Sequence, residues 1–179
     1  MSQQHLIGRL CRDLPAGKLE WIGLRSTHNG QIVEVDAVRA IAERGLEGDH
    51  RVAKTPGSGR QVTLISHEFI AQICGHLGLD QIPPALLRRN LVVSGINLNA
   101  LRYQQIRVGS QVIIEAGALC HPCSRMESAL GKGAVAAMLG YGGLCAKILC
   151  GGEIRVGDLV QKIDHPLPIA PRPIQGRLL

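Results

Sequence analysis

Two cysteines flank a His-Pro pair in the stretch L-C-H-P-C-S-R-M, residues 119–126. Thiolates are soft ligands and nucleophiles, so this pair could bind a metal, form a reversible disulfide or supply one reactive thiol. A tetrahedral zinc site would add Cys145 and Cys150 to Cys120 and Cys123. Those two residues are five apart in a segment with strand character, where their side chains point to opposite faces. A thioredoxin-like switch is also disfavoured, because the motif lies outside any β-α-β pattern.

A single working thiol at Cys123, with Cys120 as a bystander, is the better interpretation. Pro122 ends the preceding segment and Ser124 can begin a helix. The thiol therefore lies near a helix amino terminus, where the dipole and free N–H groups stabilise a thiolate. His121 adds potential positive charge. The alternative is that both cysteines pack in the core, as free cysteines commonly do.

The elements that would position this thiol are mainly strands. Residues 18–25 and 31–38 alternate polar and apolar side chains and are joined by T-H-N-G, which predicts a β-hairpin. Ser66 is the expected N-cap of a helix over residues 67–76, where apolar residues recur at helical spacing. The remaining expected elements are short helices over residues 124–130 and 134–139 and strands over residues 61–66, 90–95, 105–108, 111–115, 146–149 and 158–163.

This order of elements indicates a mainly β fold. Many short strands, glycine turns and few helices predict an antiparallel β-barrel with a few short helices covering its ends. A parallel α/β sheet fits less well, because regular strand-helix alternation and a G-x-G-x-x-G motif are absent from the sequence. The 179 residues suffice for one domain with a substantial core. From Asp164 onward the chain is too rich in proline for regular structure.

Charge and composition narrow the classes of partner. Twenty basic and 14 acidic residues leave a net charge of +6. No Lys/Arg run exceeds two residues and aromatic residues make up only 2% of the chain, so no nucleic-acid partner is expected. The first ten residues lack the features of a signal peptide, and no apolar run could span a membrane. We therefore expect a cytoplasmic protein, without membrane association, whose six cysteines stay reduced.

Five motifs follow one another along the chain: G-L-E-G-D-H (45–50), R-R-N-L-V-V-S-G-I-N-L (88–98), C-H-P-C (120–123), Y-G-G-L-C-A-K-I-L (141–149) and G-G-E-I-R-V-G-D (151–158). Together they resemble the MOSC domain, named for the carboxy-terminal domain of molybdenum cofactor sulfurases. The similarity runs from about Trp21 to Val160. Residues 1–163 are therefore expected to form a single MOSC domain, followed by a Pro-rich tail over residues 164–179.

The resemblance implies a barrel-like fold and a molybdenum cofactor (molybdopterin) bound through one cysteine, whose position Cys123 matches. A thiolate is a soft ligand that suits this metal. Arg88, Arg89 and Asn90 resemble the family's R-x-N anchor for the cofactor's phosphate, and a planar guanidinium matches phosphate geometry. Surface charge beside a strand is the alternative role of these three residues.

Four further residues complete the expected site. His121 and Ser124 border the thiol and are expected to contact the cofactor. Asp49 and His50 close G-L-E-G-D-H, where they could orient a ligand or transfer the protons that reduction of an N-hydroxyl group requires. Asp49 could equally bond only to its own turn.

Three functions stay open at this point. The first is a molybdenum-cofactor-dependent oxidoreductase that removes oxygen from N-hydroxylated small molecules, with electrons from a separate donor protein. The second is a sulfur carrier that holds a persulfide on Cys123. A cysteine desulfurase would load it, because the chain has no pyridoxal-phosphate site of its own. The third is a non-catalytic binding module that retains the cofactor without turnover.

Overall fold

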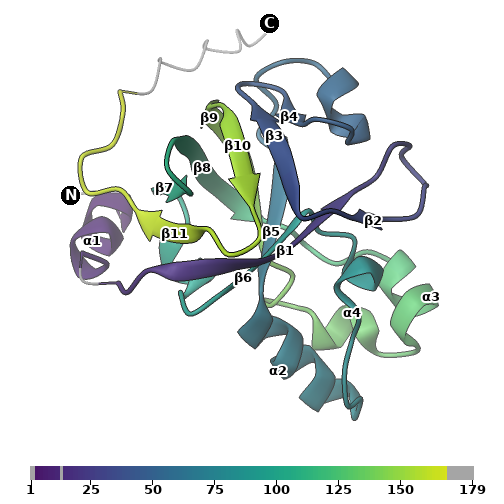
Figure 1. Ribbon diagram of the computed structural model, residues 1–179. Coiled ribbons are helices and arrows are strands. Elements are labelled where there is room, and N and C mark those ends of the chain that lie inside the picture. The colour runs from purple at the N-terminus through teal and green to yellow at the C-terminus, as the bar shows by residue number, and fades with distance from the viewer. Residues whose placement is uncertain (1–2, 13, 169–179) are drawn as a thin grey trace, which may run out of the picture.

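The computed structural model describes residues 3–12 and 14–168 (Figure 1). No helix among these residues is both long and apolar enough to span a bilayer. The helices are α1 (Gln3–Leu10), α2 (His67–Leu77), α3 (Arg125–Leu130) and α4 (Ala134–Ala137), with short 3-10 helices η1 (His50–Ala53), η2 (Pro84–Leu87) and η3 (Leu98–Leu101). The strands are β1 (Gly17–Leu24), β2 (Val33–Glu34), β3 (Ala37–Ile41), β4 (Gly45–Leu46), β5 (Val62–Ser66), β6 (Leu91–Ser94), β7 (Gln105–Val108), β8 (Val112–Leu119), β9 (Leu144–Cys150), β10 (Gly152–Arg155) and β11 (Leu159–Lys162).

Seven of the described strands close into a barrel in the order β11-β7-β8-β9-β5-β6-β1. Pairing of β1 with β11, where Gly17 lies opposite Val160, closes the ring. The prediction of a mainly β barrel is therefore confirmed. It needs one correction, because β5 and β6 run parallel, with Leu64 opposite Leu91. Parallel neighbours require a crossover connection, and the segment containing α2 and η2 supplies it.

Aliphatic side chains fill the inside of the barrel. The first residues of β1 alternate between buried and more exposed positions, whereas all five residues of β5 are buried. A strand in which every residue is buried, such as β5, is covered on both faces by neighbouring elements. Burying one such side chain stabilises the fold by about 1.5–3 kcal/mol. The fully buried members include Leu19, Ile22, Leu64, Ile106, Ile114 and Ile148.

Helices cover one end of the barrel, and a second, small sheet lies at the other (Figure 1). The predicted helix after β5 is confirmed as α2. The Ser66 hydroxyl accepts a hydrogen bond from the Phe69 N–H at 3.0 Å, and Gly78 ends the helix in the left-handed conformation. The two short helices after Cys123 are confirmed as α3 and α4. Helix α1 was not predicted. It is followed by Cys11, whose thiol donates to the Ala100 carbonyl at 3.5 Å.

The predicted hairpin is confirmed but short. Strands β1 and β2 pair only through Gly23 with Glu34 and Leu24 with Val33. The single strand expected over residues 31–38 is interrupted, because the chain leaves the barrel after β2 and re-forms as β3. Strand β3 then pairs with β4 and β10 in the small sheet. This departure brings the G-L-E-G-D-H motif, which begins as β4, back to the end of β1.

The proline-rich tail is described only as far as residue 168. Its first residues are held by Gln105 at the start of β7. The Leu167 N–H donates to Gln105 Oε1 at 2.7 Å, and the Leu167 carbonyl accepts from Gln105 Nε2 at 2.9 Å. The rest of the predicted tail lies outside the described residues.

Candidate functional site

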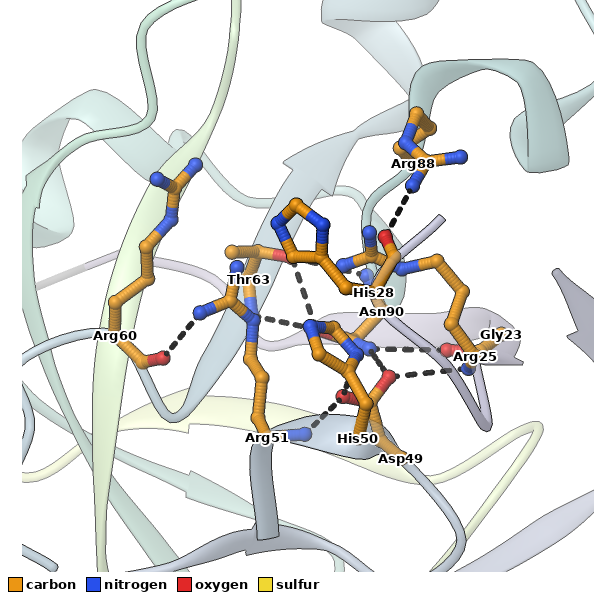
Figure 2. Close-up of polar contacts among 10 residues, drawn as sticks. All are labelled: Gly23, Arg25, His28, Asp49, His50, Arg51, Arg60, Thr63, Arg88 and Asn90. Atoms are coloured by element: carbon orange, nitrogen blue, oxygen red, sulfur yellow. Dashed lines mark hydrogen bonds and ion pairs between the residues drawn. The ribbon is translucent and has the colours of Figure 1, made fainter. Parts of the chain in front are cut away.

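The site forms where the end of β1 meets the start of η1 and the parallel strands β5 and β6 (Figure 2). The G-L-E-G-D-H motif enters it through Gly48, whose φ of 80° favours glycine. Asp49 then caps η1, since its Oδ1 accepts a hydrogen bond from the Arg51 N–H at 3.0 Å. Its Oδ2 accepts from the Arg25 backbone N–H at 3.1 Å. Asp49 therefore bonds its own turn, as one interpretation held, and also fixes that turn to β1.

Asn90 is the hub of this region. It is 1% exposed, and its Oδ1 accepts hydrogen bonds from the N–H and the hydroxyl of Thr63 at 3.1 and 3.0 Å. Its Nδ2 donates to the Gly23 carbonyl at 3.1 Å and to Asp49 Oδ2 at 3.0 Å (Figure 2). Both the oxygen and the nitrogen of the Asn90 side-chain amide are therefore hydrogen-bonded to other residues of the chain. These bonds join β1, β5 and the start of η1.

His50 lies almost buried beside this hub. Its Nδ1 is 3.1 Å from Asp49 Oδ1, although the direction is not that of a hydrogen bond. Burial lowers the pKa of His50; Asp49 opposes this effect, and Arg25 and Arg51 add to it. The imidazole is therefore neutral near pH 7. The ring of His28 lies edge-on to it, with centroids 5.7 Å apart.

Arginines converge on the site from four separate segments. Among the described residues, none of these arginines forms an ion pair with a carboxylate. Burying a cation without an anion is costly, so the buried Arg25 and the partly buried Arg51 are typical of a site that accepts an anionic ligand. The members of this arginine cluster are Arg25, Arg51, Arg60, Arg88 and Arg89.

Arg25 carries the strongest sign of a missing partner. It is 5% exposed, and its Nε is buried without a hydrogen-bond partner within the described part of the chain. Burial, followed by the nearby charge of Arg88, lowers the pKa of Arg25 to about 10. The Nε of Arg51 is also buried and unpartnered, and burial together with Arg60 lowers the pKa of Arg51. Arg88, by contrast, reaches across to donate from Nη2 to the His28 carbonyl at 2.9 Å.

Arg89 has a different position from its neighbour Arg88. Its guanidinium is buried and donates three hydrogen bonds to backbone carbonyls: from Nε to the Gly142 carbonyl at 2.7 Å, from Nη1 to the Leu87 carbonyl at 2.9 Å and from Nη2 to the Cys120 carbonyl at 3.2 Å. These bonds clamp the start of β9 and the end of β8 onto η2. Of the predicted R-R-N anchor, Arg88 is the least committed to the fold, because its side chain makes one hydrogen bond within the described residues, to the His28 carbonyl. That any of the three binds a phosphate stays a prediction.

The predicted thiol is exposed, and its neighbour is not. Cys123 lies on the surface before α3, within electrostatic reach of Arg60 and Arg89. Cys120 is 1% exposed and accepts a hydrogen bond from Arg60 Nη2 at 3.0 Å. It also lies against Cys145, with which it shares a hydrogen bond. Cys120 is therefore part of a buried, interacting group. That it is a bystander to the chemistry of Cys123 stays a prediction.

His121 and Ser124 are both exposed beside Cys123. Ser124 precedes α3 as expected, but its hydroxyl makes no capping hydrogen bond there. Their expected contact with a cofactor stays a prediction. In residues 3–12 and 14–168, no three His, Cys, Asp or Glu side chains are grouped so as to hold a metal ion. That Cys123 ligates a metal stays a prediction.

Sequence reasoning missed Arg25, Arg51 and Arg60, and it considered Cys145 only as a possible zinc ligand. The three arginines are isolated from one another in the sequence and have no motif in common, so nothing local distinguishes them from solvated surface charge. Only their positions at the end of β1, on η1 and just before β5 bring them together. Cys145 lies within the Y-G-G-L-C-A-K-I-L motif, which was the one available signal.

Comparison with known proteins places this arrangement in a family. Similar solved structures include YuaD from Bacillus subtilis, with a TM-score of 0.72, 21% identity and coverage of 83% of this chain and 96% of that one. YiiM from Escherichia coli gives a TM-score of 0.63 and 16% identity, covering 85% of this chain and 72% of the other. YiiM from Geobacillus stearothermophilus gives 0.65 and 12%, covering 82% and 75%. No curated protein sequence matches. The MOSC domain family model matches residues 49–161, more than half of the chain, and the protein therefore belongs to the MOSC domain family.

Proposed function

We propose that the chain binds the molybdenum cofactor and uses it to reduce N-hydroxylated small molecules. The family is associated with binding of this cofactor. The observation that carries the proposal is Arg25, a buried cation whose Nε has no partner among the described residues and which lies in a cluster of arginines without a carboxylate ion pair in that part of the chain. Such a cluster fits the dianionic phosphate of the pterin, which accepts several charge-assisted hydrogen bonds.

Different side chains would hold the two ends of the cofactor. Arg25, Arg51 and Arg88 would bind the phosphate, and Cys123 would ligate the metal through its thiolate. Arg60 links the two ends, because it is within electrostatic reach of both the Cys123 thiol and Arg25. When bound, the molybdenum centre would supply the two-electron chemistry that removes oxygen from the substrate. The electrons would come from a separate donor protein.

The chain's own residues would orient the substrate and manage protons. His50 is neutral, so it offers both a donor and an acceptor to an N-hydroxyl group. An anion bound among Arg25 and Arg51 would offset the charges that lower the pKa of His50, which makes its protonation easier. Asp49 and Asn90 act by positioning, since their polar atoms are occupied by the backbone and by each other. His121 and Ser124 would border the ligand beside the thiol.

The proposal is tested by measuring molybdenum and pterin separately in protein from cells that make the cofactor. The wild type should contain near-stoichiometric amounts of both. Cys123→Ser should lose most of the metal, and Arg25→Gln should lose most of the pterin. Arg107→Gln is a matched control, because that exposed arginine bonds to Gln161 across strands β7 and β11. The loaded wild type should then reduce a hydroxylamine with a reduced viologen dye.

A wild type without molybdenum or pterin would overturn the proposal. The exposure of Cys123 would then favour the sulfur-carrier function, because a protein acceptor can reach it. A mass increase of one sulfur on Cys123, after incubation with a cysteine desulfurase and cysteine, would identify that function. Stoichiometric cofactor without turnover of any N-hydroxylated compound would instead indicate a non-catalytic binding module.

A further inference from the structure

A second thiol group lies beneath the exposed cysteine. Cys120, just after β8, and Cys145, in β9, are 1% and 7% exposed and share a hydrogen bond. Their strands are held together here by the pairing of Leu119 with Leu144 and by the bond from the Cys120 N–H to the Gly143 carbonyl at 2.8 Å. The pairing of the strands therefore brings the two cysteines close together at this point of the barrel wall.

The pair divides its charge unequally. The hydrogen bond from Cys145, helped by Arg89 and Arg60 and opposed by burial, lowers the pKa of Cys120 well below its usual range. The same hydrogen bond, together with burial, raises the pKa of Cys145. Arg60 Nη2, which donates to the Cys120 sulfur at 3.0 Å, favours the negative charge of the pair on Cys120. A nucleophilic thiolate beside a second thiol is the arrangement in which oxidation ends in a disulfide.

We propose that Cys120 and Cys145 form a redox-active dithiol that hydrogen peroxide converts to a disulfide. In the first step the Cys120 thiolate attacks a peroxide oxygen, the O–O bond breaks, and the departing hydroxide takes up a proton as water. In the second step the Cys145 sulfur attacks the resulting sulfenic acid, the S–S bond forms, the S–O bond breaks, and a second water leaves. The two sulfurs lose two electrons and the peroxide gains them.

Arg60 connects this pair to the candidate site. It donates to the Cys120 sulfur at 3.0 Å from the loop before β5 and is itself exposed, so it connects the buried pair with the surface. Its own pKa is lowered by burial but raised overall by the Cys120 and Cys145 thiols. Disulfide formation removes the negative charge that Arg60 compensates. Oxidation therefore adds one unpaired cation to the arginine cluster and strengthens its attraction for anions.

Peptide mapping tests the proposal directly. The full chain is treated with hydrogen peroxide, its remaining thiols are alkylated, and it is digested with trypsin without reduction. Cys120 then lies on the peptide of residues 108–125, with Cys123, and Cys145 lies on the peptide of residues 133–147. We expect these two peptides to be linked, and the link to be broken by dithiothreitol.

The variant Cys123→Ser removes the ambiguity within the first peptide. It should form the link as fast as the wild type, whereas Cys145→Ser should not form it. Arg60→Gln should slow its formation at pH 7 by roughly tenfold, because the thiolate loses a donor and a cation; Arg107→Gln is the control and should not. A link that disappears in Cys123→Ser, or a Cys120 that stays fully alkylated after oxidation, would overturn the proposal. Neither readout depends on a bound cofactor.

Discussion

Replacing Asn90 by alanine separates two interpretations of the R-R-N motif. As a ligand contact, Asn90 would affect cofactor content and leave stability almost unchanged. As the hub seen in the structure, it would affect the fold first. Its amide makes four hydrogen bonds, to the Thr63 N–H and hydroxyl, the Gly23 carbonyl and the Asp49 carboxylate.

The size of the effect follows from those partners. The bond to the charged Asp49 is worth about 2 kcal/mol, and the buried Thr63 N–H, left without an acceptor, costs about 1–1.5 kcal/mol. The two remaining neutral partners add about 0.5 kcal/mol each. We therefore expect Asn90→Ala to lower the free energy of unfolding by about 4 kcal/mol, a factor of roughly 1,000 in the unfolding equilibrium.

Urea unfolding of the purified apoprotein measures this change. Asn99→Ala is the matched control, because Asn99 is exposed and its side chain makes no bond in the described structure; it should stay within about 0.5 kcal/mol of the wild type. Arg88→Gln should also unfold nearly like the wild type. A loss of less than about 1 kcal/mol in Asn90→Ala, with a loss of bound pterin instead, would refute the structural role.

The isosteric variant Asn90→Asp gives a second check with a definite sign. Its Oδ1 still accepts from Thr63, but the new carboxylate oxygen faces Asp49 at the 3.0 Å of the former hydrogen bond. Two carboxylates this close cannot both ionise, so the folded pKa of one rises above its unfolded value. The stabilisation that comes from the protonated carboxyl group is present at low pH and is lost as the pH rises through the folded pKa of that group. Asn90→Asp should therefore gain stability relative to Asn90→Ala as the pH is lowered from 7.

Two further predictions concern pH and backbone packing. The pKa of His50 is lowered mainly by burial, so the folded state binds fewer protons than the unfolded chain, and the free energy of unfolding should fall as the pH drops below about 6.5, the ordinary histidine value. His50→Gln should reduce this fall in urea unfolding measured as a function of pH. An unchanged slope below about pH 6.5 in the variant would contradict the lowered pKa of His50. Gly143→Ala should unfold at a much lower urea concentration than Gly140→Ala. Both glycines have positive φ, but a Cβ at Gly143 would overlap the Leu64 carbonyl, whereas none of the described atoms lies within 4 Å of a Cβ at Gly140. Equal urea midpoints would show that β5 and β9 do not approach each other closely at Gly143.

Much of the fold was accessible from local patterns. Alternation of polar and apolar residues located most barrel strands, and the Ser66 N-cap located the start of α2, because capping and strand patterning leave signatures within a few residues. The sequence did not show that β5 and β6 are parallel, or that residues 31–38 divide between two sheets. Both features depend on which strands pair with one another over long sequence separations, and the local residue pattern of a strand does not identify its partner.

The candidate site divides in the same way. The sequence by itself determined that Cys123 matches the cysteine of a MOSC motif and that Asp49 and His50 belong to a glycine-flanked turn, since these are properties of residue type and spacing. Only the tertiary structure decided that Asn90 is a buried hub, that Arg25, Arg51 and Arg60 form one cationic cluster, and that Cys120 meets Cys145. The reason is physical: burial, desolvation and charge interactions act through space, and barrel closure places side chains from separate strands within a few ångströms of one another.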